Sequence, residues 1–265
     1  MANFNPSNWD DLNARTTSAI VMVIVGAFDV YMGGIWFHFL VLFATGVMIW
    51  ELWSMIAPDR TTGAMLLAVT TTSILSTQLE NVGAVQPFLF LVVPAIGAVL
   101  LKKLRIAFFF YALVIVVAGF ALVRFRDEFG ALWILWLLLV VIASDVLGYF
   151  AGRTFGGPKF WPAISPKKTW SGTVAGWIGA GFVGLVFAVF TQASLILVPL
   201  SMLLSFAGQL GDIAESAIKR RTGIKDSSTL IPVHGGLLDR FDALLFVALV
   251  MFFTTSVFGL SGFAF

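Results

Sequence analysis

The sequence has no cysteine and few charged residues. Without cysteine, its 265 residues can form no disulfide and offer no thiolate for catalysis or metal binding. Charged residues make up 11% of the chain, well below the roughly one quarter usual in soluble domains, whereas hydrophobic residues make up 59%. The formal charge of +2 is too small to indicate nucleic-acid binding. Water is therefore not the main solvent of this chain.

Apolar runs of about 20 residues recur along the sequence, the length that a helix needs to cross a hydrocarbon core roughly 30 Å thick. The period-two alternation of membrane-barrel strands is absent from the sequence. The polar segment 1–15 does not resemble a cleaved signal peptide, so we expect the first helix to be retained. We predict an all-α, polytopic integral membrane protein with about nine transmembrane helices and short loops. The predicted spans are 17–34, 35–56, 62–80, 84–101, 106–123, 131–150, 171–191, 194–218 and 240–259.

The basic residues are distributed unevenly between the two sides of these spans. When the connections are numbered alternately, fourteen of the 16 basic residues fall on one side, leaving Arg124 and Arg126 on the other. Cytoplasmic loops carry an excess of lysine and arginine, so this pattern predicts an N-terminus inside and a C-terminus outside. An anion-binding site on the cytoplasmic side would require cations there as well, and the two explanations are compatible.

The first 130 residues are interpreted as an N-terminal transmembrane scaffold, and residues 131–265 as a C-terminal transmembrane catalytic region. In the scaffold, Asp29, Glu51 and Glu80 fall near predicted helix ends, where we expect their carboxylates to reach headgroups or water. The predicted span 171–191 instead has small residues at four-residue spacing, a pattern that allows close helix packing.

Polar residues collect from position 144 onward. Asp145, Tyr149 and Gly152 share one face of the sixth predicted span. The loop that follows contains Arg153, Lys159 and the segment SPKKT at 165–169. Such a loop could contact anionic lipid headgroups. It could equally form an ordered phosphate-binding turn before a helix N-terminus, whose free amides favour anions.

The eighth predicted span carries a polar stripe. Ser205, Gln209, Asp212, Ser216 and Lys219 follow one another at spacings of four, three, four and three. Ionisable groups in membrane helices usually face a cavity or a partner, so the stripe predicts a functional site. The alternative is a structural Asp–Lys salt bridge that holds helices together.

The ninth predicted span is preceded by a second group of carboxylates. Asp239 and Asp242 are three residues apart and share a helix face. Together with Asp212 they offer the hard oxygen ligands that Mg²⁺ prefers. Carboxylates interleaved with cations suit phosphoryl or nucleotidyl transfer, in which positioning and charge neutralisation do most of the work. A helix-capping role is the alternative for Asp239.

The segment SAIKR at 216–220, KD at 225–226 and IPVHGGLLDRFD at 231–242 resembles the signature of the phosphatidate cytidylyltransferases, the CDP-diacylglycerol synthases. GDIAES at 211–216, SPKKT at 165–169 and the stretch 145–156 are also similar to family motifs. The resemblance covers roughly residues 144–242. Two positions differ from the family pattern: Val233 stands where glycine is usual, and Ser171 where glutamate is usual.

The resemblance implies transfer of the cytidylyl group of CTP to phosphatidate, which gives CDP-diacylglycerol and pyrophosphate. A phosphate monoester is largely dianionic at neutral pH, because its second pKa is about 6, and is already a nucleophile. The expected cofactor is Mg²⁺, with a second cation allowed in a paired-metal arrangement. The implied metal ligands are Asp212 and Asp239. The implied catalytic residues are Asp212, Asp239, Lys219, Arg220, Lys167 and Lys168, and the implied substrate-binding residues are Ser165, Thr169, Ser216, Lys225, His234, Arg240, Asp145, Asp226 and Asp242.

Two alternatives remain open at this point. A relative of the family could activate another lipid phosphate, such as an isoprenoid ether lipid. An ion or solute transporter is the alternative from a different class, because intramembrane carboxylates can carry ions; it predicts matching halves, which the sequence lacks. The expected partners are CTP, phosphatidate or a related lipid phosphate, and membrane lipids, with no nucleic acid; the sequence allows a homodimer. The expected location is a bacterial-type inner membrane, with the site facing the cytoplasm.

Overall fold

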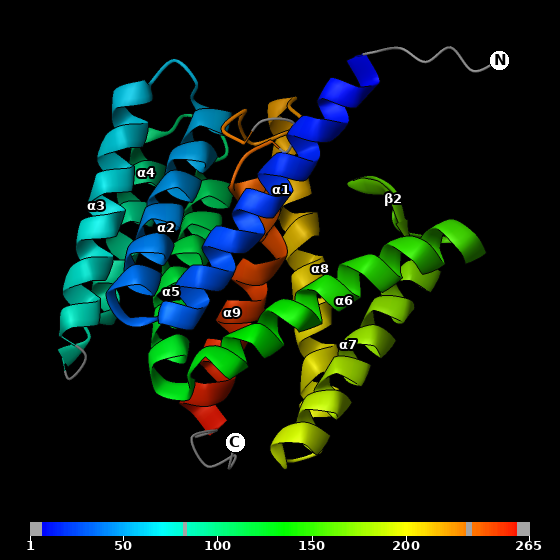
Figure 1. Ribbon diagram of the computed structural model, residues 1–265. Coiled ribbons are helices and arrows are strands. Elements are labelled where there is room, and N and C mark those ends of the chain that lie inside the picture. The colour runs from blue at the N-terminus through cyan, green and yellow to red at the C-terminus, as the bar shows by residue number, and fades with distance from the viewer. Residues whose placement is uncertain (1–6, 82–83, 232–234, 259–265) are drawn as a thin grey trace.

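Figure 1 shows a computed structural model of the chain, in which the backbone is described for residues 7–81, 84–231 and 235–258 and side chains between residues 16 and 256 of those ranges. The described residues form nine α-helices, a short 3-10 helix (η2) and one two-stranded antiparallel sheet. The elements in chain order are α1 (Ser7–Met32), α2 (Gly34–Ile56), α3 (Thr61–Glu80), η2 (Pro87–Leu91), α4 (Val92–Leu100), α5 (Arg105–Phe129), α6 (Ala131–Phe155), β1 (Lys159–Trp161), β2 (Ser165–Thr169), α7 (Trp170–Thr191), α8 (Leu197–Thr222) and α9 (Leu238–Phe258).

The all-α membrane architecture is confirmed, whereas the count of nine spans stays a prediction. Within the described residues, five helices are long and apolar enough to cross a membrane, namely α2, α5, α6, α7 and α8. The predicted span 84–101 is not one continuous helix. Pro87 begins η2, and α4 has only nine residues. Proline fixes φ and lacks an N–H, so it starts helical segments more readily than it continues them.

Two groups of helices pack on either side of α9 (Figure 1). One hydrophobic core joins α2–α5 to α9 and includes Trp53, Phe108 and Leu245. A second core joins α6–α8 to the other side of α9 and includes Trp136 and Leu204. Large apolar side chains also cover the outside: Phe190, for example, is 84% exposed. Water would not favour such an exterior, whereas a bilayer does.

The loop between α6 and α7 differs from its prediction. The sequence indicated a turn at SPKKT, but residues 165–169 form strand β2, which pairs antiparallel with β1. Lys159 lies opposite Thr169, and Trp161 opposite Ser165. The strand leads into α7, where the Thr169 side chain caps the helix by accepting a hydrogen bond from the Gly172 N–H (3.2 Å). The hairpin fixes the direction in which the side chains of Lys167 and Lys168 extend from β2.

Helix α7 packs closely between α6 and α8, as its small residues predicted. A Cβ atom added at Gly184 would overlap the backbone carbonyl oxygen of Leu197 at the start of α8. Backbone cannot move aside as a flexible side chain can, so only glycine fits there. The packing of α7 sets the distance between α6 and α8. These two helices carry most of the polar residues singled out above.

We therefore expect Gly184→Val to destabilise the protein by about 1–3 kcal/mol, the usual range for overpacking. Gly26→Val is the matched control, because nothing lies within 4 Å of a Cβ at that position on α1. Thermal unfolding of both variants in detergent gives the comparison. Equal melting temperatures would contradict the close contact between α7 and α8.

Candidate active site

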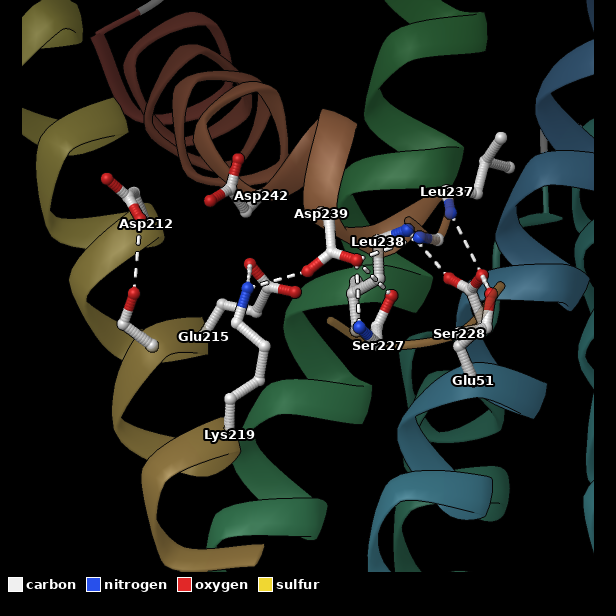
Figure 2. Close-up of polar contacts among 12 residues, drawn as sticks. Glu51, Asp212, Glu215, Lys219, Ser227, Ser228, Leu237, Leu238, Asp239 and Asp242 are labelled. Atoms are coloured by element: carbon white, nitrogen blue, oxygen red, sulfur yellow. Dashed lines mark hydrogen bonds and ion pairs between the residues drawn. The ribbon is translucent and has the colours of Figure 1, made fainter. Parts of the chain in front are cut away.

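Lys219 lies at the centre of an ion-pair cluster between α8 and α9 (Figure 2). Its Nζ is 2.6 Å from Oδ1 of Asp239 and 3.0 Å from Oε2 of Glu215. Glu215 is fully buried, and the other two side chains are largely enclosed. Charges in such surroundings interact more strongly than charges in water. The structure thus brings together Lys219 and Asp239, which come from separate parts of the predicted motif.

Asp239 also organises the loop between α8 and α9. Its Oδ2 accepts hydrogen bonds from the backbone N–H of Ser227 (2.8 Å), the Ser227 hydroxyl (2.9 Å) and the backbone N–H of Gly236 (2.8 Å). Burial alone would raise the pKa of the Asp239 carboxyl, but the hydrogen bonds from Lys219, Gly236 and Ser227 outweigh burial and lower that pKa below its ordinary value. Asp239 is therefore a carboxylate at neutral pH, and it holds the loop through donors that precede α9, which differs from the helix-capping role that was the alternative to metal binding.

Asp212, one turn before Ser216 on α8, forms a second ion pair. Its Oδ2 is 2.6 Å from Nζ of Lys168, which comes from β2, and its Oδ1 accepts a hydrogen bond from the Ser216 hydroxyl (3.3 Å). The Asp212 side chain is 38% exposed, against 7% for Asp239. A ligand can therefore reach Asp212 directly, whereas Asp239 is enclosed by its donors.

The polar stripe of α8 divides into two parts. Ser205 and Gln209 serve packing: the Ser205 hydroxyl is 2.7 Å from that of Ser144 on α6, and Gln209 accepts a hydrogen bond from Trp177 on α7 (3.1 Å). Asp212, Ser216 and Lys219 continue the stripe into the ion-pair cluster. The charged part of the stripe therefore occupies the last three turns of the helix. The earlier residues hold α6, α7 and α8 together, and the Gln209 carbonyl also accepts a hydrogen bond from Lys168 (3.3 Å).

Beside Asp212 lies a cavity of about 330 Å³ between α6, β2 and α7. Asp145, Tyr149 and Gly152 all line it, which confirms that they share one helix face. Its other polar lining residues are Ser144, Arg153, Lys167, Lys168, Thr169, Thr173 and Gln209. The cavity thus combines cations with hydroxyl and amide groups, a composition suited to a phosphate.

A second cavity, of about 880 Å³, lies against the α8–α9 loop. Asp226, Ser227 and Ser228 line it from the loop, and Lys103 and Arg221 line it from neighbouring segments. The α8–α9 loop therefore borders this second cavity, which also contains cations.

The carboxylates fit a divalent cation only in part. Within the described residues, no three histidine, aspartate or glutamate side chains are placed to bind a single metal ion. Glu215 nevertheless has a buried oxygen, Oε1, without a hydrogen-bond partner, and Asp242 lies between Asp212 and Asp239 in the view of Figure 2. Mg²⁺ is often held by one or two carboxylates, with water and substrate phosphates as its other ligands. The donor set fits Mg²⁺ bound in that way, with Asp212 as the accessible ligand.

Several predicted site residues are not joined to this cluster by a described contact. Arg220 and Lys225 are exposed, and Ser165 pairs with Trp161 in the hairpin. Thr169 is buried as the cap of α7, so its observed contacts are structural.

Two positions of interest, His234 and Val233, lie outside the described residues. At the other departure from the family pattern, the Ser171 hydroxyl donates to the carbonyl oxygen of Gly156 and lies 3.0 Å from the hydroxyl of Thr169. Ser171 therefore belongs to the junction between the hairpin and α7.

The expectation that Glu51 reaches headgroups or water is wrong. Glu51 is fully buried, and it accepts hydrogen bonds from the Ser228 hydroxyl (2.6 Å) and from the backbone N–H groups of Leu237 (2.9 Å) and Leu238 (2.7 Å). These donors lie 177 to 187 residues away along the chain, so no local pattern could reveal the contact. The one available signal was the presence of a carboxylate inside an otherwise apolar span.

Comparison with known proteins finds a matching family model and similar curated proteins. The sequence model described as the cytidylyltransferase family matches residues 13–258. The chain is 42% identical over 153 residues to a phosphatidate cytidylyltransferase of Brucella abortus (53% of this chain and 55% of the relative). It is 38% identical over 139 residues to the protein of that name in Bacillus subtilis (51% and 52%), and 45% identical over 125 residues to that of Staphylococcus saprophyticus (46% and 48%). The chain spans about half the length of these curated relatives.

The two ion pairs differ in burial, and we expect them to differ in their contribution to stability. Lys219→Met would leave the buried Glu215 and the enclosed Asp239 without their cation, at a cost of about 3–5 kcal/mol. Lys168→Met breaks a partly exposed pair and should cost only about 0–1 kcal/mol. Denaturation of both variants measures the difference. Equal losses would show that Lys219 is not the buried centre of the cluster.

Proposed function

The chain belongs to the cytidylyltransferase family, and from this premise we propose that it transfers the cytidylyl group of CTP to phosphatidate in a membrane. The proposed products are CDP-diacylglycerol and pyrophosphate. A phosphate oxygen of the lipid attacks the α-phosphorus of CTP, and the bond from that phosphorus to the β-phosphate oxygen breaks. The enzyme needs no covalent intermediate, because the lipid phosphate is itself the nucleophile.

The observation that carries the proposal is the presence of two lysine–aspartate ion pairs along α8. Lys168 pairs with Asp212, and Lys219 pairs with Asp239, so fixed charges of both signs lie close together. Two anionic substrates repel each other, and fixed cations reduce that repulsion without reorganising as water must. The site therefore offers the charge neutralisation that nucleotidyl transfer requires.

Lys167 and Lys168 are the proposed phosphate-binding residues on β2. Both line the 330 Å³ cavity, together with Arg153. A phosphate that enters this cavity competes with Asp212 for the Lys168 ammonium. The incoming phosphate thereby releases the Asp212 carboxylate for another ligand. Lys219 and Arg220 are proposed to stabilise the charge of the leaving pyrophosphate.

Asp212 and Asp239 are the proposed ligands of Mg²⁺. When bound, this ion would neutralise part of the triphosphate charge and withdraw electron density from the reacting phosphate. Asp212 is accessible for this role. Asp239 could take part only if Lys219 moved away from its Oδ1, since Oδ2 is occupied by loop donors. Asp145, Asp226 and Asp242 are proposed to support these ligands or to replace one of them.

A lipid acceptor is supported by the surface next to the 330 Å³ cavity. Tyr149 lines that cavity and is 59% exposed, and its neighbour Phe150 on α6 is 60% exposed. Aromatic side chains are favoured at the boundary between hydrocarbon and headgroups. The same geometry would also accept another lipid phosphate, such as an isoprenoid one. Family membership gives no support to the transporter alternative.

The direct test is an assay of the purified protein with labelled CTP and a panel of lipid phosphates. We expect labelled CDP-diacylglycerol when phosphatidate is present. Product with an isoprenoid phosphate alone would assign a different acceptor, and no labelled lipid with any acceptor would contradict the proposal.

Variants test the roles of the charged residues in the same assay. Asp212→Asn and Asp239→Asn should nearly abolish turnover at any Mg²⁺ concentration, because each removes a proposed metal ligand. Lys167→Ala and Lys168→Ala should each weaken CTP binding or transition-state stabilisation by about 1.5–3 kcal/mol. Lys102→Ala is the control, since Lys102 is a basic residue outside both cavities. An Asp212→Asn protein with normal turnover would rule out the metal assignment.

The proposed orientation in an inner membrane places the site on the cytoplasmic side, where CTP is available. In Figure 1 the start of α1 and the α8–α9 connection lie at one end of the bundle, and the end of α9 lies at the other. A reporter fused after Phe265 should therefore be active only outside the cytoplasm, and one inserted near Lys103 only inside. Activity of both reporters on the same side would contradict this topology.

A further inference from the structure

Glu51 connects the first half of the chain to the proposed active site. It lies near the C-terminal end of α2, and its side chain is fully buried. Figure 2 shows its carboxylate pointing at Ser228 and at the backbone of Leu237 and Leu238, where α9 begins. Its distances to these donors are 2.6, 2.9 and 2.7 Å, all within the range of strong charge-assisted hydrogen bonds.

The two amide donors are the ones that a helix leaves free at its start. The first N–H groups of a helix have no partner within it, and they carry the positive end of the helix dipole. Glu51 satisfies those of Leu237 and Leu238 at the N-terminus of α9. It therefore acts as an N-terminal cap supplied by a different helix. The next residue along α9 is Asp239, which holds Lys219.

The α8–α9 loop is held by two carboxylates from opposite sides. Ser227 donates to Asp239, and its neighbour Ser228 donates to Glu51. Gly236 donates to Asp239, and its neighbour Leu237 donates to Glu51. A Cβ atom at Gly236 would overlap both the Ser227 hydroxyl and the Glu51 carboxylate. The loop is thus held at two adjacent residues near its start and at two adjacent residues near its end.

We propose that Glu51 is a positioning residue for the transfer reaction, acting through the start of α9 on Asp239 and Lys219; this inference rests on the proposed function. A shift of about 1 Å in a group that positions the reacting atoms can cost on the order of 100-fold in rate. A residue that orients a functional carboxylate through hydrogen bonds typically contributes about 10- to 100-fold to activity. Glu51 touches no substrate in this scheme, so its effect falls on turnover more than on CTP binding.

Glu51→Gln is the informative substitution because it keeps the shape of the side chain. A glutamine amide has one accepting oxygen, and its NH₂ group would face the N–H donors of α9. Glu80→Gln is the matched control, since Glu80 is an exposed glutamate on α3 in the same half of the bundle. Ser228→Ala removes a single donor to Glu51 and leaves the side-chain partners of Asp239 in place.

The experiment combines hydrogen exchange with steady-state kinetics on the full-length protein in detergent. We expect Glu51→Gln to accelerate amide exchange in peptides covering 235–240 and not in α6. The kcat should fall by about tenfold or more, with the KM for CTP changed less than about twofold. Ser228→Ala should lower kcat by a smaller factor, and the double variant should be no worse than Glu51→Gln alone, because both act through one contact. Glu80→Gln should change none of these quantities.

Different results would overturn different claims. Unchanged exchange in 235–240 would show that Glu51 does not hold the start of α9. Faster exchange there with an unchanged kcat would show that the contact is structural only, and so would a fall in kcat accompanied by faster exchange throughout the protein. If Glu51→Gln does not fold, an unchanged kcat in Ser228→Ala overturns the inference. A wild-type protein without cytidylyl transfer would instead refute the proposed function, and the exchange data would still decide whether Glu51 holds the loop.

Discussion

A carboxylate that leaves water must find hydrogen-bond donors or a cation within the protein, and this constraint shapes the region where α2, α8 and α9 meet. Uncompensated burial of such a charge costs many kcal/mol. Glu51 meets the requirement with a hydroxyl and two helix amides, and Asp239 with a lysine and loop donors. Because the carboxylates lie on α2 and α9 and their donors on α8, the α8–α9 loop and the start of α9, satisfying the carboxylates also fixes these segments relative to one another.

The same constraint prepares the site for anionic substrates. Groups that are already held in place do not have to reorganise when charge develops in a transition state, and that is the main source of electrostatic catalysis. The two lysine–aspartate pairs differ in access, however. Lys168 and Asp212 are partly exposed and can exchange partners with a ligand, whereas Lys219 is held between two enclosed carboxylates. The first pair can therefore respond to a ligand directly, whereas the second must first exchange its partners.

Packing among α6, α7 and α8 holds the helices that carry this site. Small residues let α7 approach α8 at Gly184, and hydrogen bonds of Ser205 and Gln209 join α8 to α6 and α7. In lipid, where helices gain little from the hydrophobic effect, close packing and a few polar contacts are the available means of association. The hairpin β1–β2 then brings Lys168 over Asp212 from outside the helices. The polar site is thus built on a frame whose lipid-facing surface is apolar.

The sequence by itself determined the membrane class, the approximate position of most helices and the choice of Asp212, Lys219, Lys168 and Asp239 as candidate site residues, whereas their pairing came from the structure. These features follow from local rules: run length, helical spacing and the chemistry of closely spaced motifs. It did not reveal the strand at 165–169, because a hairpin depends on pairing between segments as well as on turn residues. Only the tertiary structure decided the role of Glu51, whose donors lie more than 170 residues away. The periodicity of α2 places Glu51 on a helix face, but the loop that covers this face is held by Asp239 of α9 as well as by Glu51. A long-range contact of this kind is fixed by how the helices pack, and no pattern within a single segment encodes it.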